Sequence, residues 1–111
     1  SLGGLLATEI LFTQPDLFDN YIIVSPSLWW DDQSLLKKNP FGYESQKSSY
    51  IAVGKEGAVM EQSAKDLHIK LNQQQQKNTQ LHFEFFEKQH HGDALHLAVY
   101  SAFEKMFGDQ K

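Results

Sequence analysis

Apolar residues alternate along the chain between helical spacing and the continuous runs typical of buried strands. Residues 5–13 are strongly apolar, follow a Gly pair and end before Pro15, so they predict a buried helix. The residues clustered in it are Leu6, Ala7, Ile10 and Leu11. The β-branched run at 21–24 is typical of a central parallel strand. A loop to about residue 48 follows, with a short helix predicted over 32–38.

Two further strands are predicted in the second half of the chain. Residues 50–53 form a short apolar run that is closed by a glycine. Residues 81–86 alternate between apolar and polar side chains, with Leu81, Phe83 and Phe85 on the apolar side. Both segments therefore suit a sheet that is buried on at least one face.

Two further helices accompany these strands. Residues 60–75 follow the 3.6-residue period of an amphipathic helix, and the four glutamines at 73–76 are predicted to be its solvated last turn. Its apolar face contains Met60, Ala64, Leu67 and Leu71. A final helix is predicted over 94–107, with Gly108 at its C-cap.

The order of these elements is helix, strand, loop, strand, helix, strand, helix. Such alternation predicts an α/β fold with a mostly parallel sheet. Because a parallel sheet must be covered on both faces, three strands with three helices make an incomplete domain. We therefore expect residues 1–111 to be the C-terminal part of a single larger α/β domain whose N-terminal strands are missing here, or whose sheet another chain completes.

Composition narrows the possible functions. The chain has 111 residues, no cysteine and a net charge of −4 with neutral histidines. The absence of cysteine excludes a disulfide scaffold, a thiolate metal site and a cysteine nucleophile. A mildly acidic chain is a poor binder of nucleic acid or of anionic membrane surfaces, and no apolar run approaches the roughly 20 residues of a membrane span. The compartment is left open between cytoplasm and periplasm.

A candidate nucleophile stands at the head of the first helix. Ser1-Leu2-Gly3-Gly4 fits the second half of a nucleophile elbow, G-x-S-x-G, in which a sharp turn exposes the serine hydroxyl and glycines let the helix pack closely on the sheet. The helix N-terminus and the Leu2 amide are then placed to stabilise an oxyanion. The same residues also fit a helix N-cap at Ser1 followed by a flexible Gly pair.

The candidate general base is His91, in the polar loop predicted after the third strand. A histidine in a loop at a strand end can turn its ring toward a serine, as acyl transfer requires. A solvated loop histidine is the alternative, and His90 is an adjacent rival. His68 and His82 are predicted to lie on the surface. His91 and His96 are five residues apart, which is not the spacing of a helical metal pair, so no metal site is expected.

The candidate acid is Glu56, in the loop after the second strand. Its place in the chain suits the order nucleophile, acid, base of this fold class, and a carboxylate there would stabilise an imidazolium. Glu87 is the rival, Asp93 is too close to His91 to orient it easily, and a solvated turn carboxylate is the alternative.

Both tryptophans of the chain, Trp29 and Trp30, follow the sequence Ser25-Pro26-Ser27 at the end of a predicted strand. In that place they would wall a pocket for an apolar or aromatic acyl group. The alternative is that they cover the edge of the core beneath the long loop.

Taken together, these motifs resemble an esterase branch of the α/β-hydrolases that includes the enterochelin (ferric siderophore) esterases and is related to the esterase D group. The resemblance runs from Ser1 to about Phe107. The stretches that carry it are Ser-Leu-Gly-Gly-Leu, Gln-Pro-Asp-Leu-Phe-Asp at 14–19, Ser-Pro-Ser-Leu-Trp-Trp at 25–30, Val-Gly at 53–54 and His-Gly at 91–92.

The resemblance implies roles for individual residues. Ser1 matches the nucleophile, Leu2 the oxyanion amide, and His91 the base in a His-Gly-Ser-like loop in which Asp93 stands where Ser is usual. The acid is placed at Glu56, although some members of the family work as Ser–His pairs. The implied function is hydrolysis of carboxylic esters, siderophore esters among them, through an acyl-enzyme and without a cofactor or metal. The alternative is a non-catalytic binding or assembly module on the same fold.

Overall fold

The structure is a computed structural model that describes residues 1–39, 42, 46–73 and 79–108, with the backbone alone at 91–94 and 96. In chain order its elements are α1 (Leu2–Thr13), the 3₁₀ helix η1 (Pro15–Leu17), β1 (Asn20–Val24), α2 (Trp30–Gln33), β2 (Lys47–Gly54), α3 (Ala58–Gln73), β3 (Thr79–Phe86) and α4 (His91–Phe107).

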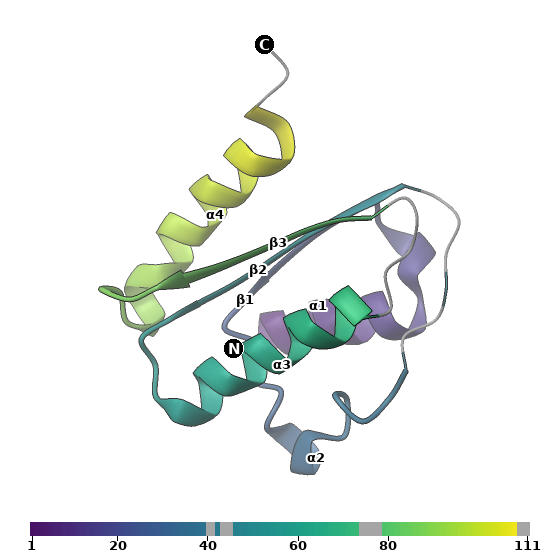
Figure 1. Cartoon of the computed structure of the whole chain (residues 1–111), viewed down its shortest axis with the longest axis horizontal. Coiled ribbons are helices and arrows are strands. Elements are labelled where there is room, and N and C mark those ends of the chain that lie inside the picture. Colours follow the sequence, from purple (N-terminus) through teal and green to yellow (C-terminus); the bar gives the residue numbers. More distant parts are fainter. Residues whose placement is uncertain (40–41, 43–45, 74–78, 109–111) are drawn as a thin grey trace.

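The described strands form one parallel sheet in the order β1-β2-β3. Figure 1 shows α1 and α3 against one face of this sheet and α4 against the other. The predicted alternating α/β architecture is therefore confirmed. Because the strands are parallel, the segments that leave β1, β2 and β3 all begin at the same edge of the sheet.

The core lies in two layers, one on each face of the sheet. Side chains of β2 alternate between the layers, with Ile51 and Val53 facing α1 and α3, and Tyr50 and Ala52 facing α4. The first layer also contains Leu11, Phe12, Tyr21, Ile23, Leu28, Leu35, Ala64 and Leu67, and the second Val24, Ala98, Ala102 and Met106.

Several element boundaries differ from the predictions. The helix predicted over 5–13 already begins at Leu2, because Ser1 caps it, and Leu6 is 55% exposed rather than buried. The reason is that α1 packs through a stripe of residues spaced four, three and one apart, namely Gly4, Thr8, Leu11 and Phe12. Of the predicted glutamine turn, Gln73 is the exposed last residue of α3 and residues 74–76 lie outside the described part of the chain.

The helix predicted over 32–38 is wrong. The structure has a single turn, α2, in which Asp31, Asp32 and Gln33 have φ between +51° and +61°. Left-handed backbone cannot continue into a right-handed helix, so the element ends there. The last helix begins at His91 rather than at residue 94, and its C-cap, Gly108, has φ of −74° and not the left-handed conformation expected of it.

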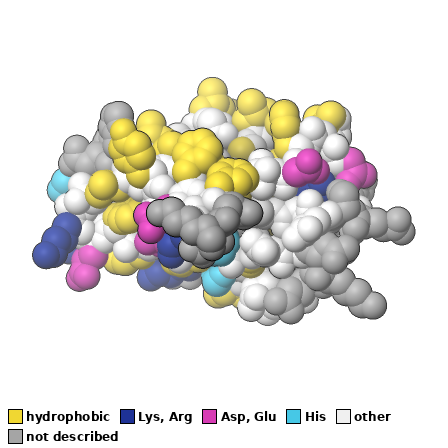
Figure 2. Space-filling model, turned by 90° about the horizontal axis from the view of Figure 1, so that it is seen from above, with side chains coloured by type: hydrophobic (Ala, Val, Ile, Leu, Met, Phe, Trp, Pro, Cys, Tyr) yellow, Lys and Arg dark blue, Asp and Glu magenta, His cyan; other side chains and the backbone are white. Residues whose placement is uncertain are grey.

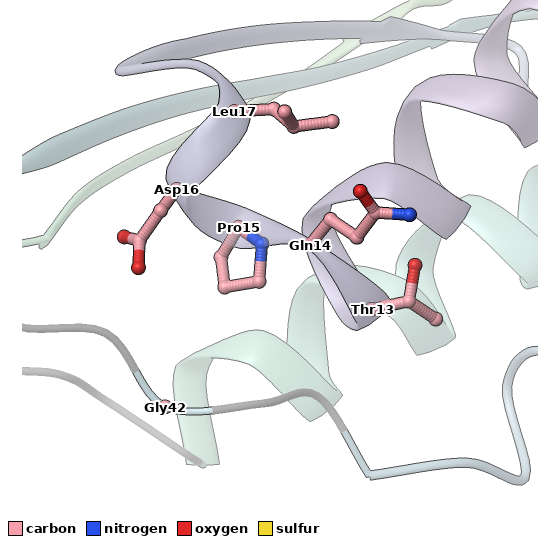
Figure 3. Close-up of a pocket in the computed structure, with 6 residues that line it drawn as sticks. All are labelled: Thr13, Gln14, Pro15, Asp16, Leu17 and Gly42. Carbon is pink, nitrogen blue, oxygen red and sulfur yellow. The ribbon is translucent and has the colours of Figure 1, made fainter.

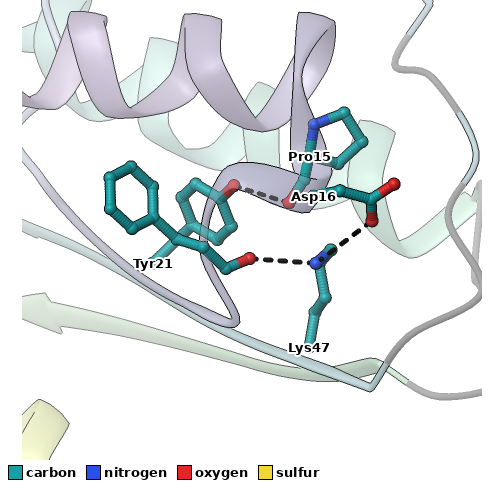
Figure 4. A network of polar contacts seen from close by, with 5 residues as sticks. Pro15, Asp16, Tyr21 and Lys47 are labelled. Atoms are coloured by element: carbon teal, nitrogen blue, oxygen red, sulfur yellow. Dashed lines mark hydrogen bonds and ion pairs between the residues drawn. The ribbon is translucent and has the colours of Figure 1, made fainter.

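A polar contact ties the start of β2 to the turn after α1, as Figure 4 shows. The side chain of Lys47 is fully buried. Its ammonium donates to the Phe18 carbonyl over 2.9 Å and lies 3.6 Å from the Asp16 carboxylate. The Tyr21 hydroxyl donates to the Pro15 carbonyl over 2.8 Å. The Pro-Asp-Leu-Phe motif thus anchors the amino ends of β1 and β2.

The outer side of α4 is rich in exposed apolar side chains. Figure 2 looks onto this side of the molecule and shows hydrophobic groups reaching the surface. Tyr100, Phe103 and Phe107 are each exposed by 44% or more, and the rings of Phe103 and Phe107 lie 5.8 Å apart. Within the described part of the chain, no helix has the length and apolar character needed to cross a membrane.

Candidate active site

Ser1 lies at the carboxyl end of β1, at the head of α1. Its hydroxyl accepts a hydrogen bond from the Gly4 amide over 3.1 Å and donates one to the Val24 carbonyl over 3.0 Å. The predicted N-cap is therefore present. The cap and the exposed position of an elbow serine are compatible, because the capping contact uses an acceptor lone pair and leaves the proton free to change partner.

Only one of the two glycines after Ser1 sits in a close contact. A Cβ on Gly4 would lie 2.7 Å from the Val24 carbonyl oxygen and 2.8 Å from Cα of Pro26, whereas a Cβ on Gly3 would meet nothing within 4 Å. Gly4 is thus the residue that lets α1 approach the end of β1. This contact holds Ser1 against the sheet edge.

Ser25, the first residue after β1, connects three segments. Its backbone is left-handed, with φ of +46°, and the residue is fully buried. Its amide donates to the Ala52 carbonyl over 2.8 Å, its carbonyl accepts from the Ser1 amino nitrogen, and its hydroxyl donates to Oε2 of Glu56. The sequence offered no signal for this role, because it depends on a backbone conformation that serine rarely adopts.

Glu56 is held in the loop between β2 and α3. Its Oε2 also accepts from the Gly54 amide over 2.8 Å. Oε2 of Glu61 accepts from the amides of Glu56 and Gly57 over 2.9 and 3.0 Å, in the manner of a carboxylate that reaches back from the first turn of a helix. Two carboxylates therefore fix this loop, one within it and one from α3.

The charge of Glu56 reaches the head of α1. The Glu56 carboxylate lies close enough to the Ser1 backbone nitrogen for its negative charge to act there. A carboxylate that close to the Ser1 backbone lies on the same side of the sheet edge as the candidate nucleophile.

The loop that carries the histidines lies beside the Glu56 loop. The Lys55 amide donates to the Gln89 carbonyl over 2.6 Å, and Nδ1 of His90 lies 3.2 Å from the Lys55 carbonyl oxygen. His90 is extended, with φ of −94° and ψ of 178°, and His91 begins α4 directly after it. His91 is thus at a helix start rather than in a loop.

The structure describes only some side chains of the other candidate acids and bases. The side chains of His91, Asp93 and His96 lie outside the described part of the structure. Glu87 is exposed in the turn after β3. No cluster of three or more His, Asp or Glu residues that could hold a metal ion occurs among the described residues.

The prediction that His68 and His82 lie on the surface is wrong. Both are partly buried, His68 is stacked on Phe83 with ring centroids 5.0 Å apart, and Nε2 of His82 is enclosed without a hydrogen-bond partner among the described residues. Burial lowers the pKa of His68. His68 lies on α3 and packs against a ring of β3, a contact between elements that a surface prediction from residue type overlooks.

Trp29 and Trp30 follow Ser25 closely and are 49% and 61% exposed. They therefore do not cover the core edge as buried residues. A cavity of about 370 Å³ lies instead at the other end of α1, lined by Thr13, Gln14, Pro15, Asp16, Leu17 and Gly42 (Figure 3). Since α1 separates it from Ser1, this cavity is not part of the candidate site.

Comparisons with known proteins bear on this geometry. No family model matches the chain. Siderophore triacetylfusarinine C esterase of Aspergillus fumigatus is 46% identical over 50 residues, which are 45% of this chain and 17% of that protein. Siderophore enterobactin esterase of Emericella nidulans is 53% identical over 36 residues, which are 32% of this chain and 12% of that protein.

A solved structure matches over a longer stretch. The crystal structure of the BES protein from Bacillus cereus has a TM-score of 0.84 and 30% identity, covering 91% of this chain and 41% of that one. The chain thus spans less than half the length of these proteins. The resemblance to enterochelin esterase-like proteins is confirmed, and the parallel sheet with its flanking helices is part of an α/β-hydrolase fold.

Proposed function

We propose that this chain carries the catalytic residues of a serine esterase that hydrolyses carboxylic esters, with siderophore esters as its substrate class. The relatives that match in sequence are named as siderophore esterases, which supports ester hydrolysis as the reaction. We further propose that residues 1–111 form the C-terminal portion of a single α/β-hydrolase domain in a longer parent protein.

The observation that carries the proposal is the contact of three segments at the carboxyl edge of the sheet. Ser25 contacts both Ser1 and Glu56, and the Glu56 loop is bonded to the segment that leads into His91. The order nucleophile, acid, base along the chain is that of α/β-hydrolases. These contacts support Glu56 over the exposed Glu87 as the acid.

The proposed chemistry has two halves. His91 accepts the proton of the Ser1 hydroxyl while Oγ attacks the ester carbonyl carbon, and the Leu2 amide donates to the resulting oxyanion. The intermediate collapses, the alcohol leaves with the proton from His91, and an acyl-enzyme remains. Water then gives a proton to His91 and attacks the acyl carbon. As this second intermediate collapses, His91 returns the proton to Oγ of Ser1, which releases the acid and restores both residues.

Further features of the site enter this scheme as parts of the proposal. The Ser1 hydroxyl donates to Val24 in the structure, and its O–H must turn about the Cβ–Oγ bond to donate to His91 instead. Glu56 accepts the other imidazole N–H and stabilises the imidazolium. Trp29 and Trp30, exposed after β1, form one wall of the acyl pocket, and strands of the parent protein that precede Ser1 supply the opposite wall and a second oxyanion donor.

The test uses the full-length parent protein with p-nitrophenyl acetate and butyrate as substrates. Ser1→Ala is expected to lower kcat/KM by a factor of about 10³ or more, because it removes the nucleophile. Ser63→Ala is the matched control, since Ser63 lies on α3 and takes no part in the contacts described above. Equal rates in Ser1→Ala and the unchanged protein would refute the proposal, and no activity in either would favour a binding module.

A further inference from the structure

We propose that Ser25 is a positioning residue that orients Glu56 and links it to the head of the helix that carries the nucleophile. This inference rests on the proposed function, in which Glu56 is the acid. Ser25 itself touches neither substrate nor reacting atoms in this scheme. It acts through the carboxylate that its hydroxyl contacts.

The backbone of Ser25 is the first argument. Ser25 has a left-handed conformation, with φ of +46°. Glycine adopts this conformation without steric cost, whereas any residue with a Cβ adopts it only at a steric cost. The residue is also fully buried, so its side chain gains nothing from solvent. Compared with glycine, serine adds a hydroxyl at this position, and that hydroxyl donates a hydrogen bond to Glu56.

The second argument is that three bonds of one residue join the three parts of the site. The Ser25 amide keeps the residue in register with β2 through Ala52. Its carbonyl accepts from the Ser1 amino nitrogen, and its hydroxyl donates to Glu56, 31 residues further along the chain. A shift of the Glu56 loop relative to Ser1 therefore has to break a contact of Ser25.

The third argument concerns the state of the carboxylate. Oε2 of Glu56 accepts from two donors, the Ser25 hydroxyl and the Gly54 amide. Donors to a carboxylate oxygen favour the ionised form and restrict rotation of the group. The ionised, fixed form is the one that can accept an imidazole N–H and stabilise the imidazolium.

The experiment compares Ser25→Gly with Ser25→Ala in the full-length parent protein. Both variants remove the hydroxyl, but only glycine also relieves the backbone. We expect both to lower kcat/KM by about tenfold to a hundredfold, the effect of one lost hydrogen bond to a charged group. We also expect the acidic limb of the kcat/KM profile, which reports protonation of the base His91, to shift, because the carboxylate that faces the imidazole is no longer held by its hydroxyl donor. A role in folding alone would instead separate the two variants, with glycine behaving as the unchanged protein.

A double-mutant cycle with Glu56→Gln makes the test specific. If Ser25 acts through Glu56, adding Ser25→Gly to Glu56→Gln changes kcat/KM by no more than about twofold, since the charged carboxylate through which Ser25 acts is already lost. The inference would be overturned if the double variant lost kcat/KM by the product of the two single losses. Full activity of Ser25→Gly with an unshifted pH profile would also overturn it. Ser1→Ala distinguishes failure of this inference from failure of the proposed function. If Ser1→Ala is inactive and Ser25→Gly is fully active, only the positioning role is refuted. If Ser1→Ala is active, the proposed function and the positioning role are both refuted.

Discussion

Substitution of Gly4 by alanine tests whether close packing of α1 on the end of β1 holds the candidate site. The added Cβ would lie 2.7 Å from the Val24 carbonyl oxygen and 2.8 Å from Cα of Pro26, where ordinary contacts begin at 3.4 Å. Both obstructing atoms belong to the backbone, so no side-chain rotation relieves the overlap. The head of α1 must move away by several tenths of an ångström and carry Ser1 with it.

Gly3→Ala is the matched control for this change. Gly3 is the preceding residue of the same helix, and a Cβ there meets nothing within 4 Å. Alanine is favoured over glycine in a helix by up to about 1 kcal/mol, a gain that both variants share to a similar degree. The difference between them is therefore the cost of overpacking, about 1–3 kcal/mol.

The assay is urea unfolding of the full-length parent protein, with the two variants followed side by side. We expect Gly3→Ala to be as stable as the unchanged protein or more so, and Gly4→Ala to be less stable than Gly3→Ala by about 1–3 kcal/mol. Ester hydrolysis by Gly4→Ala should also fall, because Ser1 moves relative to Glu56. Equal free energies of unfolding for the two alanine variants would refute the packing argument.

Two further predictions concern polar groups that tie the layers together. Glu84 accepts from the Tyr50 hydroxyl over 2.7 Å and from the Ser101 hydroxyl, and lies 3.6 Å from the Lys105 ammonium. Burial alone would raise the pKa of Glu84, but these hydrogen bonds and the lysine charge together hold it below the ordinary 4.5. The stability that Glu84 contributes is therefore complete above about pH 4.5 and is lost as the pH falls through the lowered pKa of Glu84. In urea unfolding at pH 7, 4 and 3, the free energy of unfolding of Glu84→Gln should therefore fall less with pH than that of the unchanged protein. Lys47→Met should lower the free energy of unfolding by about 1–3 kcal/mol, because the Phe18 carbonyl loses a charged donor; an unchanged midpoint in urea would show that this bond contributes nothing.

The fold was predictable where burial imposes a local period. The runs at 21–24 and 50–53 lie within β1 and β2 because a parallel strand covered on both faces needs apolar residues in succession. The alternation of β3 and the helical spacing of α3 follow from burial of one face in the same way.

The site was predictable only as a set of segments. Chain order placed Ser1, Glu56 and the His90–His91 pair at the carboxyl edge of a parallel sheet. The Ser25–Glu56 contact and the left-handed turn at 31–33 were not predictable, since both arise from positive φ at residues that seldom adopt it. Contacts such as Tyr50 with Glu84, 34 residues apart, depend on strand register, which sequence spacing alone does not determine.

The central claim, that Ser1 is a nucleophile activated by its neighbours, is tested most directly by covalent labelling. The full-length parent protein is treated with a fluorophosphonate probe, digested and analysed by mass spectrometry, alongside Ser1→Ala and Glu56→Gln. The account predicts phosphonylation of the peptide that contains Ser1, no labelling in Ser1→Ala, and slower labelling in Glu56→Gln, because the base is then less well oriented. Labelling at another residue, or none in the unchanged protein, would contradict the account.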